Sequence, residues 1–196
     1  MVPWYWSVEK QPESVVTLLF EVSLPHLPLH LERRIHLDRA DPSVLRIQER
    51  VTNAGHESIP IEWGQHIAFG APFLSEACTF EVPALPQGEN AWSGRDADGR
   101  DLRRVLGPDA HTEDFGIFEG FSDGWYRIIN HVLNVGVDVK WDVALLLCLW
   151  LWPEFQRSSG HPFYGWCYVM GLEPCSTNTH AGIAESVRHH TPCSTA

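Results

Sequence analysis

The stretch Tyr164–Pro174 reads YGWCYVMGLEP and places a carboxylate between an apolar run and a proline. Rings and small residues alternate along its first part, which predicts a β-strand. Because proline lacks an N–H for the ladder, we expect Pro174 to end this strand and to leave Glu173 at its terminus. A carboxylate held there among rigid aromatic neighbours is placed for proton transfer. The alternative is a solvated glutamate, which is the ordinary state of this residue type.

Length and composition indicate one globular β-domain. A chain of 196 residues can bury most of the apolar surface that it exposes when unfolded. Fourteen prolines and 15 glycines break it into short segments, which favours many strands over a few long helices. Nine tryptophans suit a cleft lined by flat rings. We expect one domain over residues 1–177 and an irregular tail over 178–196, with a short helix near Ala181–Val187.

Several segments alternate with a period of two, as half-buried strands do. Residues 29–37, 44–52 and 135–143 show this pattern, and the β-branched segment 14–24 is also expected to be a strand. Asp41-Pro42-Ser43 has turn chemistry. Strands joined this closely predict an antiparallel meander, because parallel neighbours need a crossover of about a dozen residues or more.

Beyond residue 143 the chain is almost continuously apolar as far as Trp152. This change predicts that the strand passes from a half-wet surface into an interior buried on both faces. A helix is the alternative for 143–152, but the two tryptophans and the following proline favour a central strand. The other expected segments are strands at 58–73 and 78–84 and a surface excursion at 86–114.

Charge argues against two classes of partner. The formal net charge is −11, and the only basic pairs are Arg33-Arg34 and Arg103-Arg104. A nucleic-acid backbone or an anionic membrane is therefore not the expected partner, whereas a neutral or cationic small ligand fits.

Cysteine usage and the termini indicate a cytoplasmic location. Five cysteines without a CxxC pair suggest neither a disulfide framework nor a zinc knuckle. The segment Met1–Trp6 lacks a basic region and a cleavage site, so it does not look like a secretory signal. The longest apolar run, Val143–Trp152, is short of the roughly 20 residues that a membrane helix needs.

A second candidate element is Trp63-Gly64-Gln65-His66. Its histidine follows an expected strand and precedes a glycine-containing aromatic loop, where an imidazole can face a cleft. Taken alone, His66 is more often a structural histidine than a catalyst. Taken together with segments far away in the sequence, however, the residues around His66 favour a catalytic histidine over a structural one.

Five stretches together resemble the galactose mutarotase-like superfamily, specifically the aldose 1-epimerase-related proteins. They are Arg50-Val51-Thr52-Asn53, the segment 65–74 (QHIAFGAPFL), the segment 149–152 (LWLW) with the turn 124–126 (GWY), and 171–174 (GLEP). The resemblance covers most of residues 3–177 in order. It implies a large antiparallel β-sandwich, the supersandwich of that superfamily.

The resemblance also implies a reaction, the interconversion of the α and β anomers of a free aldose. It assigns Glu173 as the base and His66 as the acid, with no metal and no cofactor. Their free pKa values of about 4.3 and 6.5 suit both to proton transfer. Asp123 is a candidate acceptor of sugar hydroxyls, and the candidates for a stacking floor are Trp63, Trp150 and Trp152. For each of these rings, packing in the core is the alternative.

The chain departs from the family pattern at both ends. Complete members carry an additional N-terminal set of strands with a His-Gly motif, and this chain begins downstream of where that motif would fall. The segment 191–196 has no strand pattern. We therefore expect an incomplete sandwich that keeps the acid and the base but lacks part of the substrate clamp, with open edges that favour association.

Two other functions stay open at this point. One is a non-catalytic sugar-binding sandwich. The other is a metal-dependent enzyme of cupin type, although its candidate ligands lack a His-x-His pair: His111, His131, His161 and His180. The sequence does not fix which sugar is bound, whether the sugar is phosphorylated, the oligomeric state, or whether turnover occurs.

Overall fold

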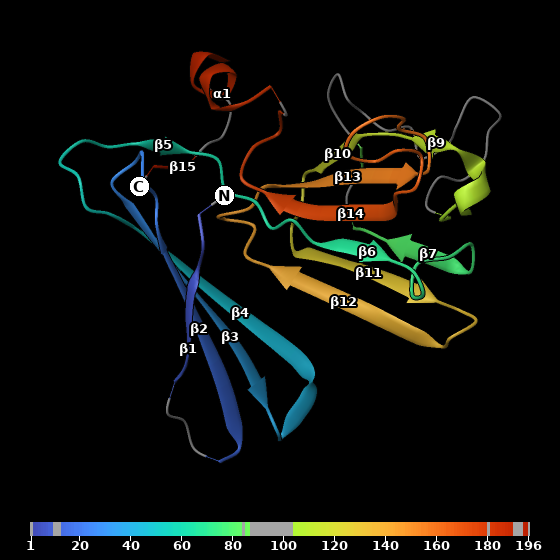
Figure 1. The fold of residues 1–196 in the computed structure, drawn as a ribbon, viewed down its shortest axis with the longest axis horizontal. Coiled ribbons are helices and arrows are strands. Elements are labelled where there is room, and N and C mark those ends of the chain that lie inside the picture. Colours follow the sequence, from blue (N-terminus) through green and yellow to red (C-terminus); the bar gives the residue numbers. More distant parts are fainter. Residues whose placement is uncertain are drawn as a thin grey trace. The chain divides into compact units, whose positions relative to one another are not determined.

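Antiparallel strands dominate the described part of the chain (Figure 1). The computed structural model describes residues 2–9, 13–83, 85–86, 104–179, 181–189 and 194–195. The chain divides into two compact units. Unit 1 comprises residues 1–60 with 195–196, and unit 2 comprises residues 61–194.

Unit 1 is a four-stranded antiparallel sheet with the order β1-β2-β3-β4. Its strands are β1 (Tyr5–Glu9), β2 (Val15–Ser23), β3 (Leu29–Asp38) and β4 (Asp41–Asn53). These bounds confirm the strands and the meander predicted for 14–24, 29–37 and 44–52. The expected turn at Asp41-Pro42-Ser43 is wrong, because those residues already belong to β4. The turn lies at residues 39–40, where Asp38 Oδ1 accepts a hydrogen bond from the Ala40 N–H at 2.8 Å.

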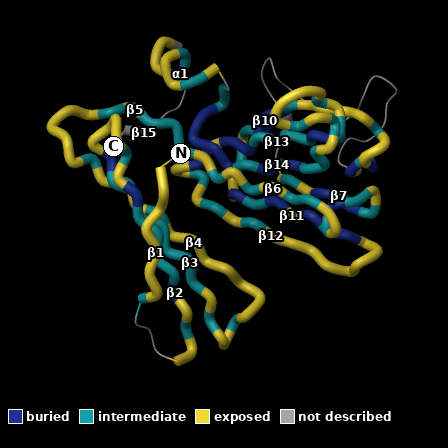
Figure 2. Tube along the Cα trace, in the orientation of Figure 1, coloured by how far each residue is buried: buried dark blue, intermediate teal, exposed yellow. Residues whose placement is uncertain are grey.

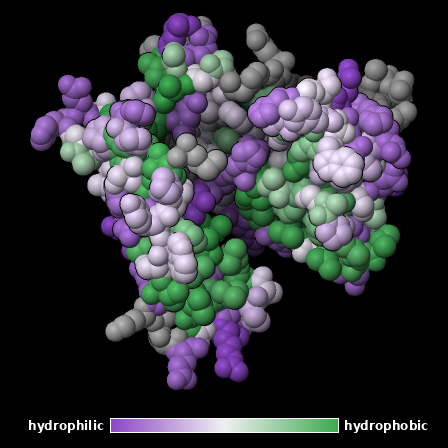
Figure 3. All heavy atoms as spheres, in the orientation of Figure 1, coloured by the Kyte–Doolittle hydropathy of each residue, from purple (hydrophilic) through white to green (hydrophobic). Residues whose placement is uncertain are grey.

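Alternation gives this sheet two chemically different faces. Leu18, Ile35 and Ile47 occupy one register row, so their side chains share a face. We call it the apolar face of unit 1; its members are Trp6, Val8, Val16, Leu18, Phe20, Val22, Leu31, Ile35, Leu37, Leu45, Ile47 and Val51. Half-buried strands were expected here, but much of this face is open: Trp6 is 68% exposed and Leu45 59%. Figures 2 and 3 show the exposed strands and the apolar side chains gathered on this sheet.

Unit 2 contains two sheets. One has the order β6-β14-β13-β10-β8, with β9 also paired to β13, and the other has the order β12-β11-β7. Their strands are β6 (Ala68–Gly70), β7 (Cys78–Glu81), β8 (Leu85–Pro86), β9 (Thr112–Glu113), β10 (Gly116–Glu119), β11 (Gly124–Asn130), β12 (Val135–Trp141), β13 (Cys148–Phe155) and β14 (Tyr168–Cys175). The remaining elements are β5 (Pro60–Ile61), β15 (Ser194–Thr195), the 3-10 helix η1 (Pro108–Ala110) and the helix α1 (Ile183–His189). None of the described helices is long and apolar enough to cross a membrane.

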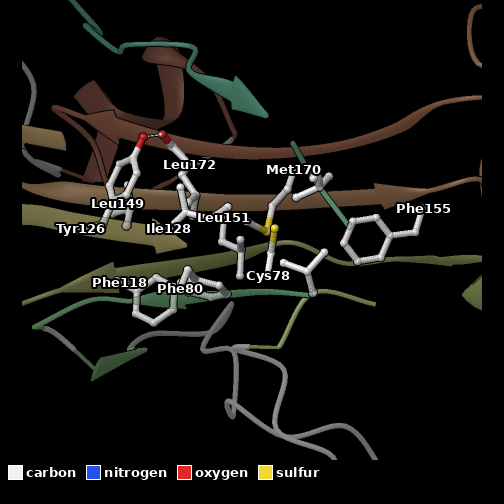
Figure 4. Close-up of a cluster of buried hydrophobic side chains, with 12 residues drawn as sticks. Cys78, Phe80, Phe118, Tyr126, Ile128, Leu149, Leu151, Phe155, Met170 and Leu172 are labelled. Carbon is white, nitrogen blue, oxygen red and sulfur yellow. Dashed lines mark hydrogen bonds between the residues drawn. The ribbon is translucent and has the colours of Figure 1, made fainter. Parts of the chain in front are cut away.

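A buried core joins the two sheets of unit 2 (Figure 4). Phe80, Tyr126 and Ile128 come from the smaller sheet, while Leu151 and Leu172 come from the larger one. These side chains are at most 2% exposed. The larger sheet therefore has one face on the core, and the alternate residues of β13 and β14 point to the opposite face.

Two local expectations fail between β12 and β14. The predicted continuous strand through 143–152 is interrupted, because Asp142 starts a turn: its Oδ1 accepts from the Ala144 N–H at 2.9 Å and its carbonyl from the Leu146 N–H at 3.0 Å. Leu145 is 62% exposed in this turn, so the apolar run is not all buried. The alternation around Tyr164 also lies in a turn, and β14 starts only at Tyr168.

The remaining segments are shorter than expected. Within 58–73 only β5, an isolated bridge at Gly64 and β6 form, and the strand expected at 78–84 ends at Glu81. Of the expected excursion 86–114, residues 87–103 lie outside the described residues. The helix α1 lies close to the short helix expected near 181–187.

Candidate functional site

Two segments more than 100 residues apart are held together by backbone hydrogen bonds. The Ser176 N–H donates to the Trp63 carbonyl at 2.7 Å, and the Trp63 N–H donates to Ser176 Oγ at 2.8 Å. The Gln65 N–H donates to the Pro174 carbonyl at 2.9 Å. The expectation that Pro174 ends the strand is wrong, because β14 continues past Glu173 to Cys175. Pro174 cannot donate a hydrogen bond, but its carbonyl still accepts one. This ladder aligns the WGQH segment with the end of the GLEP segment.

The ladder brings the two predicted catalytic side chains together. His66 Nδ1 lies 3.3 Å from Glu173 Oε1. The side chain of His66 is 70% exposed, whereas that of Glu173 is 14% exposed. The pair thus combines a largely covered carboxylate with an imidazole open to solvent.

Two glycines make room for this arrangement. A Cβ atom on Gly171 would lie 2.5 Å from Glu173 Oε1, so the carboxylate occupies the space above that residue. A Cβ atom on Gly64 would lie 2.9 Å from Cys175 Sγ. A Cβ atom at either position would therefore have to displace the side-chain atom beside it, since real Cβ contacts do not fall this short.

Burial changes the acidity of groups around Glu173. Desolvation raises the pKa of the Glu173 carboxyl above its usual range, and the nearby His66 opposes that rise. Tyr126 lies on the core side of β14, where its hydroxyl donates to the Leu172 carbonyl at 3.2 Å. Burial and then the charge of Glu173 raise the Tyr126 pKa as well. Glu173 can therefore hold a proton at a higher pH than an exposed glutamate can.

Two of the predicted tryptophans share the face of Glu173. Trp150 is the cross-strand partner of Glu173, and Trp152 is the partner of Gly171. Opposite residues on an antiparallel pair project to the same side of the sheet, so both indoles flank the carboxylate. Their ring contacts are with Phe115 (centroids 5.5 Å apart for Trp150) and Phe163 (5.8 Å for Trp152).

The other predicted site residues lie differently. Trp63 is partly buried and contributes its backbone to the ladder with Ser176. Asp123 is exposed in the turn before β11, and in the described part of the chain no contact joins it to His66 or Glu173. The structure thus brings together His66, Glu173 and two of the predicted rings, but not Asp123.

Two cysteines near Glu173 were not predicted from the sequence. Cys148 and Cys175 are cross-strand partners, two residues along their strands from the pair Trp150 and Glu173. Burial raises the pKa of each thiol to about 12. Both thiols are therefore neutral near pH 7. The alternation of β14 was the available signal, because it places Cys175 on the face of Glu173.

Two histidines of the cupin alternative have hydrogen-bond partners outside this site. His111 Nδ1 contacts the Gln156 carbonyl, and His131 Nε2 contacts Thr79 Oγ1. His180 lies outside the described residues. Across the described ranges, no group of three or more His, Cys, Asp or Glu side chains is arranged to hold a metal ion.

Solved structures with a similar fold include three bacterial proteins. A candidate aldose 1-epimerase from Klebsiella pneumoniae matches with a TM-score of 0.69 and 18% identity, over 96% of this chain and 48% of that one. A candidate aldose 1-epimerase from Escherichia coli K12 matches with a TM-score of 0.61 and 18% identity, over 97% and 62%. A galactose mutarotase related enzyme from Lactobacillus acidophilus matches with a TM-score of 0.54 and 17% identity, over 87% and 59%.

These matches define the class of the fold, an antiparallel β-sandwich of the galactose mutarotase-like kind, matched over part of those structures. The predicted fold class is confirmed. The chain belongs to the family described as Domain of unknown function (DUF4432), whose profile matches residues 6–191. It spans between about half and three fifths of the solved structures that it matches. A comparison with curated proteins found no match.

Proposed function

We propose that this protein binds a free aldose and interconverts its α and β anomers by general acid–base catalysis. The observation that supports this function is the pair of His66 and Glu173, 3.3 Å apart on a sheet face that also carries Trp150 and Trp152. Carbohydrate rings present apolar C–H faces that stack on indoles, and their hydroxyls need polar groups with fixed positions.

Ring opening requires two proton transfers. Glu173, when ionised, takes the proton from the anomeric hydroxyl, while protonated His66 gives a proton to the ring oxygen. The bond between the anomeric carbon and the ring oxygen breaks, and the open-chain aldehyde forms. Rotation about the neighbouring C–C bond and closure on the other face, with both proton transfers reversed, give the second anomer and restore the two side chains.

A bound sugar has to separate the His66 imidazole from the Glu173 carboxylate. In the structure the imidazole faces the carboxylate directly, so a sugar that bridges them takes the place of that contact. The side chain of His66 is 70% exposed and has room to move, whereas that of Glu173 is 14% exposed and lies opposite Trp150 on the neighbouring strand. We therefore expect the imidazole to move more than the carboxylate when a sugar binds.

The test is the equilibration of one freshly dissolved anomer, such as α-D-glucose or α-D-galactose, followed by polarimetry or NMR. We expect the protein to accelerate equilibration and Glu173→Gln to lower the rate by about 100-fold or more, the range typical for loss of a general base. Glu81→Gln, at an exposed position of β7, is the matched control and should keep the rate. Equal rates with and without the protein for every aldose tried, or an unchanged rate in Glu173→Gln, would refute the proposal.

A non-catalytic sugar-binding protein is the second candidate. The direct contact between His66 and Glu173 favours it, because this contact occupies both groups in the described structure. Saturable binding of an aldose without any acceleration of equilibration would select this function over the first.

A further inference from the structure

The strand β12 forms one edge of the smaller sheet of unit 2 (Figure 1). On one side it pairs with β11 over all of its seven residues. Among the described strands, β11 is the only one that pairs with it. The outer row of backbone N–H and C=O groups of β12 is therefore open to a further strand.

Natural edge strands usually carry features that prevent pairing with another chain, such as proline, a bulge or a very short length. The strand β12 is seven residues long, keeps a regular register with β11 and contains no proline. Five of its seven residues are exposed, as Figure 2 shows along the strand. Its charged residues, Asp138 and Lys140, have opposite signs, so they do not repel every partner.

Alternation gives β12 one polar and one apolar side. Asp138 and Lys140 project from the outer face of the sheet, whereas the alternate residues Val137, Val139 and Trp141 project toward the core. Val139 and Trp141 pack against the buried core, but Val137 is still 36% exposed. A strand added at this edge would therefore cover apolar surface on one side and meet charges on the other.

A second copy of β12 fits this edge in an antiparallel register centred on Val139. In that register Asp138 of each copy lies opposite Lys140 of the other, because the twofold symmetry repeats the pair. Val139 faces its own counterpart, and Val137 faces Trp141 of the second copy. Opposite residues of an antiparallel pair have Cβ atoms about 4.5–5.5 Å apart, which is close enough for ion pairs and apolar contacts. Both sides of the strand are thus self-complementary.

The two ion pairs would extend a row of alternating charges that already crosses the sheet. Arg127 on β11 is the cross-strand partner of Asp138, and it donates to that carboxylate from Nε at 2.5 Å and from Nη2 at 2.7 Å. Glu81 on β7 is the partner of Arg127 on its other side. A carboxylate has about four acceptor sites, so Asp138 can also accept from a lysine. Lys140 of a second copy would therefore be the next charge in this row.

The long edge strand of unit 1 lacks this complementarity. The strand β4 ends its sheet, and the charged residues on its polar face are Arg46 and Arg50. A symmetric antiparallel pairing of β4 centred on Gln48 would set these arginines against each other, which is unfavourable. Charge thus favours β12 over β4 as a contact between two copies.

We propose that two copies of this protein associate through β12, so that their three-stranded sheets join into one continuous sheet. This contact is independent of the proposed function. Only residues 137–141 of each copy pair directly, so the interface is small, and we expect a dissociation constant in the micromolar rather than the nanomolar range. The net charge of −11 on each chain opposes association, and about 0.15 M salt screens that repulsion beyond about 8 Å.

Sedimentation equilibrium in this salt, over a range of protein concentrations, tests the register. Asp138→Lys alone sets lysine against lysine, and Lys140→Asp alone sets aspartate against aspartate. We expect each variant to bind its own copies about 10-fold or more weakly than the native protein does, because like charges directly opposite each other are destabilising.

An equal mixture of the two variants is the decisive sample. There the new lysine of one chain lies opposite the new aspartate of the other, and the retained Lys140 lies opposite the retained Asp138. We therefore expect the mixture to recover most of the native association, which also shows that both variants are folded. The matched control is Glu81→Lys on β7, at the opposite edge of the same sheet, which should associate like the native protein.

Hydrogen exchange locates the contact within the chain. We expect the amides of residues 135–141 to exchange more slowly as the protein concentration rises, and those of residues 44–52 to be unaffected.

Five results would overturn the inference. The native protein could stay monomeric up to about 1 mM, either single variant could associate like the native protein, or the mixture could show no recovery. Protection could also rise with concentration in another segment in place of residues 135–141. Finally, protection of residues 135–141 that does not depend on concentration would mean that another part of the chain covers this edge.

Discussion

The two units of this protein are built from similar alternating strands but bury them very differently. In unit 2 two sheets pack together, and Ile128, Leu149 and Leu172 are fully buried between them. In unit 1 the apolar face stays open over much of its area, with Leu45 59% and Ile47 48% exposed. Alternation thus makes a sheet amphipathic, but a second layer is what turns its apolar side into a core.

This difference also explains where the candidate site lies. Glu173 sits on the back of a sheet whose other face carries the core, so its strand is fixed by packing. Strands without a packed layer hold side chains less firmly, because burial and contacts limit their movement. A site that needs a fixed carboxylate is therefore expected in unit 2.

The largest expected effect contrasts one leucine from each unit. Leu151→Ala, at a position 1% exposed, should lower the free energy of unfolding by about 2–5 kcal/mol, since it leaves a cavity in the core. Leu45→Ala, at a position 59% exposed, should change it by less than about 0.5 kcal/mol. Urea denaturation of both variants measures the contrast.

A loss at Leu45 as large as that at Leu151 would contradict the comparison. It would mean that the apolar face of unit 1 is covered in solution. Repeating the measurement over a range of protein concentrations would then show whether a second copy covers it, because association makes stability depend on concentration.

A smaller effect, on rate rather than folding, is expected at Gly171. A methyl group there collides with Glu173 Oε1, and the carboxylate can move aside because it is the end of a flexible side chain. We expect Gly171→Ala to keep most of the stability but to slow anomer equilibration by about 100-fold, the cost of misplacing a catalytic group by about 1 Å. Anomer NMR together with a urea denaturation curve measures both quantities.

An unchanged rate in Gly171→Ala would show that the position of the carboxylate is not critical. The matched control is Gly136→Ala in β12, where the nearest atoms to an added Cβ are side-chain and backbone atoms of residues 128–129, at 3.3 Å or more. It tests a glycine in a strand of the same unit without disturbing Glu173.

The smallest effect is a pH dependence of stability. Since burial raises the pKa of Glu173, the folded protein keeps this proton at a pH where the unfolded chain has lost it. The native protein should therefore lose stability relative to Glu173→Gln as pH rises from the ordinary glutamate pKa of about 4.3 through the raised value. Below that ordinary value the difference between them should be constant.

Urea denaturation at a series of pH values measures this difference, with Leu45→Ala as a control that changes no titratable group. A gain in the stability of the native protein relative to Glu173→Gln as pH rises through that range would contradict the prediction. Such a result would mean that the charge of His66 outweighs the burial of the carboxylate.

The sequence predicted the strands of unit 1 and the proximity of His66 and Glu173. It did not predict several turns and strand boundaries of unit 2. The strand boundaries of unit 1 follow from alternation, which is a local property. The proximity of His66 and Glu173, more than 100 positions apart, came from the family resemblance. Periodicity alone does not predict contacts between distant parts of a chain. Trp150 lies opposite Glu173 on the neighbouring strand, and its role as a stacking surface for a sugar stays a prediction.

The failures have local and non-local causes. The turn after Asp142 depends on hydrogen bonds from one side chain and one carbonyl, which an apolar run conceals. The exposure of Leu45 depends on whether a second layer covers the sheet, and no pattern within the strand records that.

The close approach of Gly64 to Cys175 links two motifs in a way that a mutational design has to respect. Both residues share one small volume, so enlarging either requires shrinking the other. Transplanting the WGQH motif into another scaffold without the GLEPC motif would therefore lose this fit and separate the imidazole from the carboxylate.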